Sequence, residues 1–134
     1  MELKLNNQIF TQKNATMVSI YDLFKTLSLS NFIVMYTTID IYIIKKVAEL
    51  REKAGLKQEE LSHLLGFATG STFVSSAERF YKAKYNIYHL NELAKILKCD
   101  IADFFPHPFQ DANSLQEYRD AKKEAKSKTK EKEK

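Results

Sequence analysis

The stretch that decides the fold runs from Leu56 to Tyr81 and reads LKQEELSHLLGFATGSTFVSSAERFY. Its first part predicts a short helix that begins at Gln58, because leucines recur there at helical spacing and form one apolar face. These leucines are Leu61, Leu64 and Leu65. Gly66 is expected to end this helix, because glycine adopts the left-handed conformation common after helix C-termini at little cost.

A second short helix is predicted after a turn at 67–70. Ser71 or Thr72 is its expected N-cap, because a hydroxyl oxygen accepts a hydrogen bond from the free N–H groups at the start of a helix. At about 100° per residue, one face of this helix is mainly apolar and the opposite face is small and polar. The first face holds Val74, Ala77, Glu78 and Tyr81, and the second holds Thr72, Ser75, Ser76 and Arg79. Two helices joined by a short turn are typical of proteins that place a recognition helix in the DNA major groove.

The segment 44–106, about half of the chain, resembles the Cro/repressor-type helix-turn-helix family, also called the xenobiotic-response-element family. The resemblance is carried by KKVAELREKAGLKQEELSHLLG, then FVSSAE, then LNELAKILKCDIADFFP. Several motifs follow the order of the family: Arg-x-x-x-Gly-Leu, Gln-Glu-Glu-Leu, a Leu-Gly turn, a Glu that ends the recognition helix, and a closing Asp-Phe-Phe. The series as a whole is specific, whereas Gln-Glu-Glu-Leu alone would be weak.

This resemblance implies an all-α fold, a compact five-helix lambda-repressor-like helix-turn-helix domain. It also implies a sequence-specific DNA-binding transcriptional regulator that places its third helix in the major groove of operator DNA, usually as a homodimer. One alternative stays open on the same scaffold. This is an antitoxin-type protein-interaction module that binds a toxin partner and its own operator.

The chain departs from the family pattern in two places. The family usually has Ser or Thr directly before the Gln of its second helix, and this chain has Lys57, which is a poor N-cap. The distance from Gly66 to Glu78 is also roughly two residues longer than in the family. The additional residues fall within 67–72, so they change the approach to the recognition helix.

The predicted DNA contacts divide into two groups. Base edges are expected to face Ser71, Thr72, Ser75 and Ser76, and phosphates are expected to contact Gln58, Arg79, Lys82 and Lys84. Hydroxyl groups both donate and accept, so they discriminate bases poorly, and DNA shape is expected to supply part of the specificity. The aromatic side chains of Tyr81 and Tyr85, which alternate with the basic residues, are expected in the core.

A structural ion pair is predicted between Arg51 and Glu78. A first helix is expected from Asp40, as its N-cap, to Ala54, and Arg51 falls on its apolar face beside Val47. An unpaired charge on such a face is costly. Glu78 lies at the edge of the inward face of the recognition helix, and the resembled family has this pair, which holds its first helix against its third.

Two further helices are expected before the chain loses its apolar residues. The fourth runs from about Ile87 to Leu97 with Asn86 as N-cap, and a short fifth begins after Asp100 and stops at Pro106. The adjacent residues Phe104 and Phe105, with Phe109, offer more aromatic surface than one small helix can bury, which favours a dimer contact there.

The chain is therefore divided into an N-terminal extension at 1–39, a helix-turn-helix domain at 40–106 and a charged tail at 107–134. The extension is expected to be poorly ordered or to form an arm that completes a dimer. Its end, Phe32 to Ile44, is rich in residues that favour strands. The tail is expected to be a frayed helix or disordered, because it has too little apolar surface to offset its ordering entropy.

Composition narrows the class of protein. The single cysteine, Cys99, cannot form a disulfide within one chain and fits a reducing cytoplasm. No cofactor, metal site or enzymatic activity is expected: the chain has no Gly-rich phosphate loop, and His63 has no second ligand at metal spacing. The net charge of +4 is spread along the chain, so DNA contact depends on local placement of Lys and Arg. No secretory signal or membrane span is expected either.

Overall fold

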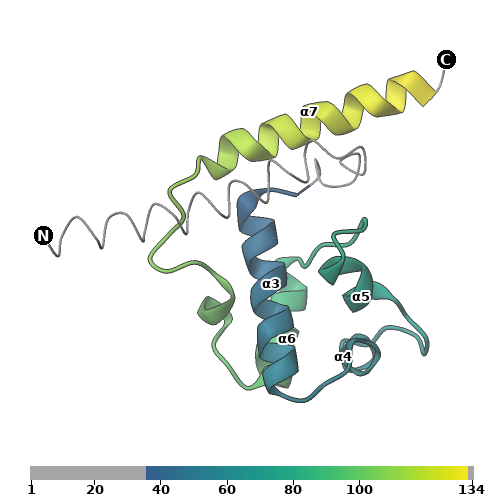
Figure 1. The fold of residues 1–134 in the computed structure, drawn as a ribbon, viewed down its shortest axis with the longest axis vertical. Helices are drawn as coiled ribbons and strands as arrows, with labels where there is room; N and C mark the ends of the chain where they lie inside the picture. The colour runs from purple at the N-terminus through teal and green to yellow at the C-terminus, as the bar shows by residue number, and fades with distance from the viewer. Residues whose placement is uncertain (1–35, 133–134) are drawn as a thin grey trace, which may run out of the picture.

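The computed structural model describes residues 36–132, and this part of the chain is all-α, with no strand in it. Figure 1 shows α3 at the centre of the molecule, with α7 lying across its N-terminal end. The elements are α3 (Thr38–Lys53), α4 (Gln58–Leu64), α5 (Phe73–Glu78), α6 (Ile87–Leu97), the 3-10 helix η1 (Ile101–Phe104) and α7 (Ser114–Lys132). The fifth predicted helix is thus a 3-10 turn. The predicted arm or poorly ordered extension lies outside the described residues up to position 35.

Helix α3 begins earlier than predicted, because its N-cap is Thr37 and not Asp40. The Thr37 hydroxyl accepts from the Asp40 N–H at 3.2 Å, and the Asp40 carboxylate accepts from the Thr37 N–H at 2.9 Å. This reciprocal arrangement is a capping box, in which Asp40 is the third helical residue. The β-branched residues before Ile44 are therefore helical, since burial of one helix face outweighs their preference for strands.

The core extends upstream of position 40 to Tyr36, whose side chain is 1% exposed. The Tyr36 hydroxyl donates to the carbonyl of Ala83 at 2.8 Å and accepts from the N–H of Ala83 at 3.0 Å. Its ring also meets Phe80 edge-on, with 5.6 Å between the ring centroids. Residues 36–39, assigned to the extension on sequence alone, are thus part of the packed domain.

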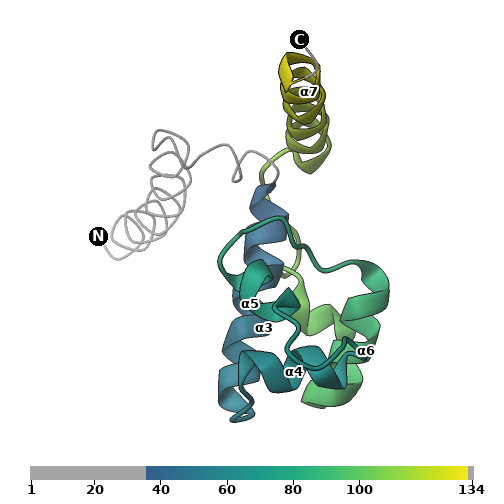
Figure 2. The ribbon, with the colours of Figure 1, turned by 90° about the vertical axis from the view of Figure 1, so that its right-hand side faces the viewer.

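The core forms where the helices meet below α7 (Figure 2). Helix α3 contacts α5, α6 and η1, and α4 packs on α5. Each of these elements contributes one fully buried apolar side chain or more, among them Val47, Leu61, Val74, Leu93 and Phe104. Phe105 is half-buried and packs against the edge of this core, so of the three phenylalanines predicted to offer surplus aromatic surface only Phe109 is largely exposed.

The buried face of α4 differs from the predicted one. Leu61 is fully buried, but Leu64 is 52% exposed, and Ser62 is buried in its place. Viewed along the axis of α4, Leu61, Ser62 and Leu65 lie on the face that meets the core. Leu64 projects about 100° away from the centre of that face. The helix has only two turns, and leucines flank Leu61 on both sides. The spacing of leucines therefore could not predict which side would be buried.

The charged tail forms helix α7, which is joined to the N-terminus of α3. The carboxylate of Glu117 accepts from the backbone N–H of Thr38 at 2.8 Å and lies 2.9 Å from its hydroxyl. A carboxylate at this position satisfies a free N–H of α3 and favours the positive end of its dipole. Among the described residues, no helix has the length and apolar content needed to cross a membrane.

Candidate nucleic-acid interface

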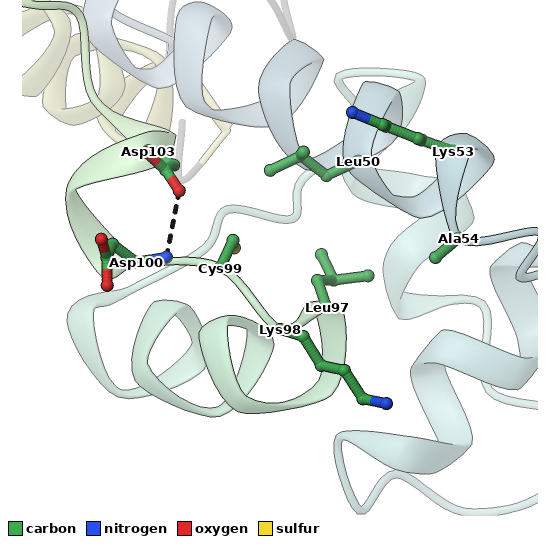
Figure 3. A pocket seen from close by; sticks show the side chains of 8 residues that line it. All are labelled: Leu50, Lys53, Ala54, Leu97, Lys98, Cys99, Asp100 and Asp103. Carbon is green, nitrogen blue, oxygen red and sulfur yellow. Dashed lines mark hydrogen bonds between the residues drawn. The ribbon is translucent and has the colours of Figure 1, made fainter.

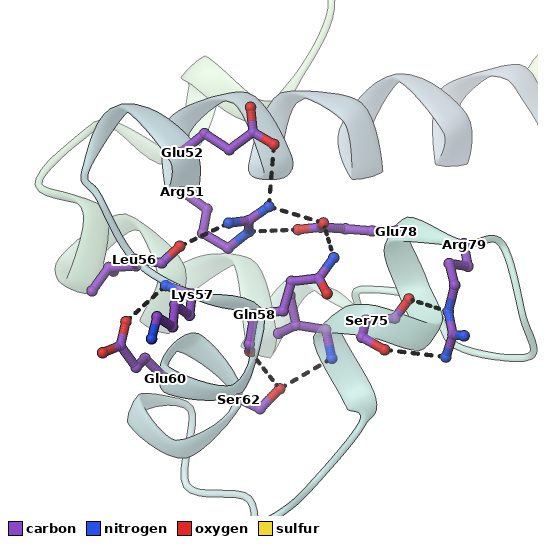
Figure 4. Close-up of polar contacts among 11 residues, drawn as sticks. Arg51, Glu52, Leu56, Lys57, Gln58, Glu60, Ser62, Ser75, Glu78 and Arg79 are labelled. Atoms are coloured by element: carbon purple, nitrogen blue, oxygen red, sulfur yellow. Dashed lines mark hydrogen bonds and ion pairs between the residues drawn. The ribbon is translucent and has the colours of Figure 1, made fainter.

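The pair α4–α5 is held together by the buried hydroxyl of Ser62. This hydroxyl donates to the carbonyl of Gln58 at 3.0 Å and accepts from the backbone N–H of Val74 at 3.2 Å (Figure 4). The Val74 N–H belongs to the first turn of α5, where it has no partner within the helix. Val74 and Ala77 are fully buried, as the helical spacing predicts, so the opposite face of α5 points outward.

The predicted pair of Arg51 and Glu78 is present at the junction of α3, α4 and α5. The Nε of Arg51 lies 2.7 Å from Oε1 of Glu78, and its Nη2 lies 3.0 Å from Oε2. Nη1 donates to the carbonyl of Leu56 at 2.7 Å. The two charged side chains are 9% and 10% exposed. The hydrogen bond with Glu78 raises the pKa of Arg51, so the guanidinium stays charged.

Gln58 belongs to the same network. Its side-chain amide donates to the carboxylate of Glu78, as Figure 4 shows. This first residue of α4 was predicted to contact phosphate, but its half-buried side chain is turned toward the protein. Its observed role is to join the start of α4 to the end of α5.

The predicted base-facing residues gather at the start and on the outer face of α5. Thr72 is exposed, whereas Ser71, Ser75 and Ser76 are half-buried. Of the two predicted capping residues, Ser71 makes the side-chain contact: its hydroxyl accepts from the N–H of Phe73 at 3.3 Å. Thr72 is the N-cap by position but makes no side-chain capping bond.

Arg79 folds back over the end of α5 and covers part of this face. Its Nη2 donates to the hydroxyl of Ser75 at 3.1 Å, and its Nε donates to the carbonyl of Ser75 at 3.2 Å. The guanidinium is thereby a second donor to the Ser75 carbonyl, which also accepts from the backbone N–H of Arg79 at 3.1 Å, and it remains exposed to solvent. Arg79 and Ser75 thus form one polar surface on the outward side of α5 (Figure 4).

The loop after α5 leaves the helical path, which corrects the predicted position of Tyr81. Phe80 and Lys82 have positive φ angles of 54° and 56°. As a result, Phe80 packs on the core residue Tyr36, while Tyr81, predicted to be buried, is 49% exposed. Tyr85 is buried as predicted, and this burial raises the pKa of its hydroxyl.

The two lysines of this loop have different surroundings. Lys84 lies 2.8 Å from the carboxylate of Asp40, and its ammonium sits 5.1 Å above the ring of Tyr36. The side chain predicted to contact phosphate is therefore engaged with α3. Lys82 is exposed, with its ammonium 5.5 Å from the centroid of the Tyr81 ring. Of the predicted phosphate contacts, Arg79 and Lys82 thus have exposed side chains.

An aromatic cluster anchors the longer turn that precedes α5. Phe67 stacks on Phe73 with 4.3 Å between ring centroids, and His89 of α6 lies 4.9 Å from Phe73. Phe67 belongs to the segment that holds the two additional residues, so its stacking fixes that segment against the first residue of α5. Burial lowers the pKa of His89, and its Nδ1 accepts from the N–H of Asn86 at 3.3 Å. Both observations favour the neutral imidazole.

A second surface, an open groove of about 770 Å³, lies between the C-terminal ends of α3 and α6 (Figure 3). It is lined by Leu50, Lys53, Ala54, Leu97, Lys98, Cys99, Asp100 and Asp103. Burial raises the pKa of Cys99, so its sulfur is held as a thiol and not as the more reactive thiolate. Between residues 36 and 132 there is no group of three His, Cys, Asp or Glu side chains that could hold a metal ion.

No protein-family model, no curated protein and no solved structure matches this chain. The fold and the site themselves define an all-α domain in which two short helices, α4 and α5, are connected at the surface by polar contacts. These contacts are the Arg51–Glu78 pair and the bond from Val74 to the Ser62 hydroxyl. The polar face of α5 carries the exposed Thr72 and Arg79 and the half-buried Ser75 and Ser76.

Proposed function

We propose that the protein is a sequence-specific DNA-binding regulator with a lambda-repressor-like helix-turn-helix, in which α5 enters the major groove of operator DNA. The observation that carries the proposal is the outward face of α5. It combines Thr72, Ser75, Ser76 and Arg79 on a helix whose other face is fully buried. Small polar side chains let a helix approach base edges closely, and Arg pairs well with guanine or with phosphate.

The way α5 is seated supports this proposal. Base readout requires that a recognition helix be held at one angle to the groove, because a shift of about 1 Å breaks a hydrogen bond to a base. Arg51, Gln58 and Glu78 connect the three helices through short hydrogen bonds, and Ser62 fixes the first turn of α5. These contacts fix the orientation of α5 and therefore the positions of the side chains on its outer face.

The exposed basic side chains of Arg79 and Lys82 at the C-terminal end of α5 supply the backbone contact in this proposal. Arg79 lies at the end of the outward face and Lys82 follows it in the loop, where the sugar–phosphate backbone runs past a helix in the major groove. The domain between 40 and 106 carries ten basic and nine acidic residues, so its net charge alone gives little attraction. Local contacts of this kind therefore decide where DNA docks.

The proposal includes a homodimer that reads a palindrome with half-sites about 34 Å apart, one helical turn of DNA. Support comes from apolar side chains outside the core. Phe109 is 72% exposed and Leu115 is 66% exposed, and both lie near the start of α7. Exposed apolar side chains of this size are candidates for an interaction surface.

The proposal is tested by selecting bound duplexes from a random pool with the whole protein. We expect enrichment of one palindromic motif, and sedimentation of the selected duplex with two protein chains bound. Recovery of unrelated sequences after several rounds would contradict sequence-specific binding. A single chain on the enriched duplex would contradict the dimer alone.

A further inference from the structure

Helix α7 gathers five of its basic side chains on one face. At about 100° per residue, five basic side chains fall within an arc of roughly 100°. These are Arg119, Lys122, Lys123, Lys126 and Lys130, and all are exposed. Acidic side chains fall within an arc of roughly 60° on the other side of the same helix. These are Glu117, Asp120, Glu124 and Glu131, and Lys128 falls beside them rather than on the basic side.

The helix is oriented so that its basic face, defined by the five residues above, points away from the domain. Glu117, on the acidic face, is bound to Thr38 at the N-terminus of α3. The basic face lies on the far side of the helix from this anchor. In a disordered tail the same charges would mix and nearly cancel. The helical form prevents this cancellation.

Within the basic face, neighbouring side chains repel one another. Lys122, Lys126 and Lys130 follow at i, i+4 and i+8, and Arg119 stands four residues before Lys123. Like charges at this spacing destabilise a helix. In the described part of the chain none of these five residues forms an ion pair with a carboxylate, and Lys122 instead lies over the ring of Tyr118. An external polyanion would relieve the repulsion.

We propose that the basic face of α7 is a second binding surface for the phosphate backbone of nucleic acid, separate from α5. From Arg119 to Lys130 the face extends for about 16 Å along the helix axis. The same length of duplex DNA carries roughly ten phosphates, so each basic side chain can meet one. The free end of α7 projects to the same side of α3 as α5 does (Figures 1 and 2).

Nucleic acid fits this face better than a lipid surface does. A helix that binds membranes combines basic residues with a broad apolar face that enters the acyl chains. Between Lys122 and Glu131 the only uncharged residues of α7 are Ala125, Ser127 and Thr129. Such a segment has no apolar side chain to insert, and the exposed Leu115 and Tyr118 at the start of α7 are too few to form a broad apolar face. The partner of the basic face is therefore recognised by charge.

The choice of duplex DNA as the polyanion rests on the proposed function. The test therefore uses two duplexes, one enriched by the whole protein and one of unrelated sequence, and measures affinity against salt concentration. The stripe variant is Lys126→Gln with Lys130→Gln. The control is Lys53→Gln with Lys98→Gln, which removes the same charge from exposed positions beside the groove at the opposite end of α3.

We expect the stripe variant to reduce the slope of log K against log salt by about two on both duplexes, since each lost phosphate contact contributes about 0.9. The sequence preference and the circular dichroism spectrum should stay unchanged, and the control variant should keep the full slope. An unchanged slope in the stripe variant overturns the inference. Binding of wild type to phosphatidylserine vesicles, lost in the stripe variant while the DNA slope is kept, overturns it in favour of a membrane.

The two proposals fail in different ways. Suppose that wild type shows no sequence preference, but the stripe variant still has a smaller salt-dependence slope on the unrelated duplex. The proposed recognition role of α5 is then contradicted, and the proposed role of the basic face is supported. Suppose instead that wild type prefers the enriched duplex, and the stripe variant has the same affinity as wild type at every salt concentration. The proposed role of the basic face is then contradicted, and the recognition role of α5 is supported.

Discussion

The side chains of Arg51 and Glu78 meet at two points, with 2.7 Å between Nε and Oε1 and 3.0 Å between Nη2 and Oε2. Arg51 lies near the end of α3 and Glu78 is the last residue of α5. The pair therefore connects two helices that are distant in sequence. A buried ion pair adds little net stability, because desolvation offsets most of its attraction. Its role here is to fix the orientation of α5 relative to α3.

Removing one partner of this pair should be strongly destabilising. Arg51→Ala leaves the carboxylate of Glu78 largely buried with no opposite charge, which costs about 3–5 kcal/mol in the free energy of unfolding. Lys46→Ala is the matched control: its partner Glu49 is 62% exposed, so the loss should stay below about 1 kcal/mol. Urea denaturation measures both. If the two variants unfold at the same urea concentration, the Arg51–Glu78 pair does not act as a buried lock.

The Ser62 hydroxyl should matter although it is a single small group. Ser62→Ala leaves the buried N–H of Val74 without an acceptor, so we expect a loss of about 1–3 kcal/mol in unfolding free energy. Ser127→Ala serves as control, because its exposed hydroxyl bonds only to the carbonyl of Glu124 in its own helix. The control should change stability by no more than about 0.5 kcal/mol. Equal effects of the two substitutions would contradict the role given to Ser62.

The elements that could be predicted from the sequence are those that local signals specify. Helix α6 begins at Ile87 and ends at Leu97 as predicted, because Asn86 is a strong N-cap and the apolar spacing covers three turns. The start of α4 at Gln58 was also predicted. The partner of Arg51 followed from the cost of an unpaired charge together with the family resemblance.

The features that the sequence did not predict depend on contacts between residues that are distant in the chain, or on the residue at which a helix ends. Ser62 is buried because the N–H of Val74 needs an acceptor, and no local signal reveals that contact. Tyr81 was placed by extending the helical period beyond Glu78, although α5 ends there. The charge of α7 was judged from composition, which cannot show that a helix gathers five basic residues on one face.

Stability should fall as the pH decreases below neutral, with His89 as one source. In the unfolded chain His89 takes up a proton near its ordinary pKa of about 6.5, whereas burial lowers its pKa in the folded state. The unfolded state thus binds more protons between these two values, so stability is full above about pH 7.5 and decreases toward pH 5. His89→Gln should flatten the dependence of unfolding free energy on pH in this range. An unchanged pH profile would show that His89 contributes nothing to it.

Arg79 and Lys84 should differ in their effect on DNA binding. Arg79→Ala should reduce the salt dependence of affinity by roughly one phosphate contact if the guanidinium reaches the backbone. Lys84→Ala should leave that dependence unchanged, because Lys84 already pairs with Asp40 at 2.8 Å. Titration of labelled duplex at several salt concentrations measures both slopes. A larger loss of slope for Lys84→Ala would show that the lysine leaves Asp40 when DNA binds.

The measurement that tests the central claim most directly compares the sequences selected from a random duplex pool by wild type, by Thr72→Ala with Ser76→Ala, and by Ser127→Ala. Thr72 and Ser76 lie on the outer face of α5, whereas Ser127 lies in α7. We predict that wild type and Ser127→Ala enrich the same motif, and that the double variant changes the preferred base at one or two positions of each half-site. Enrichment of the same motif by all three proteins would contradict the claim that α5 reads DNA.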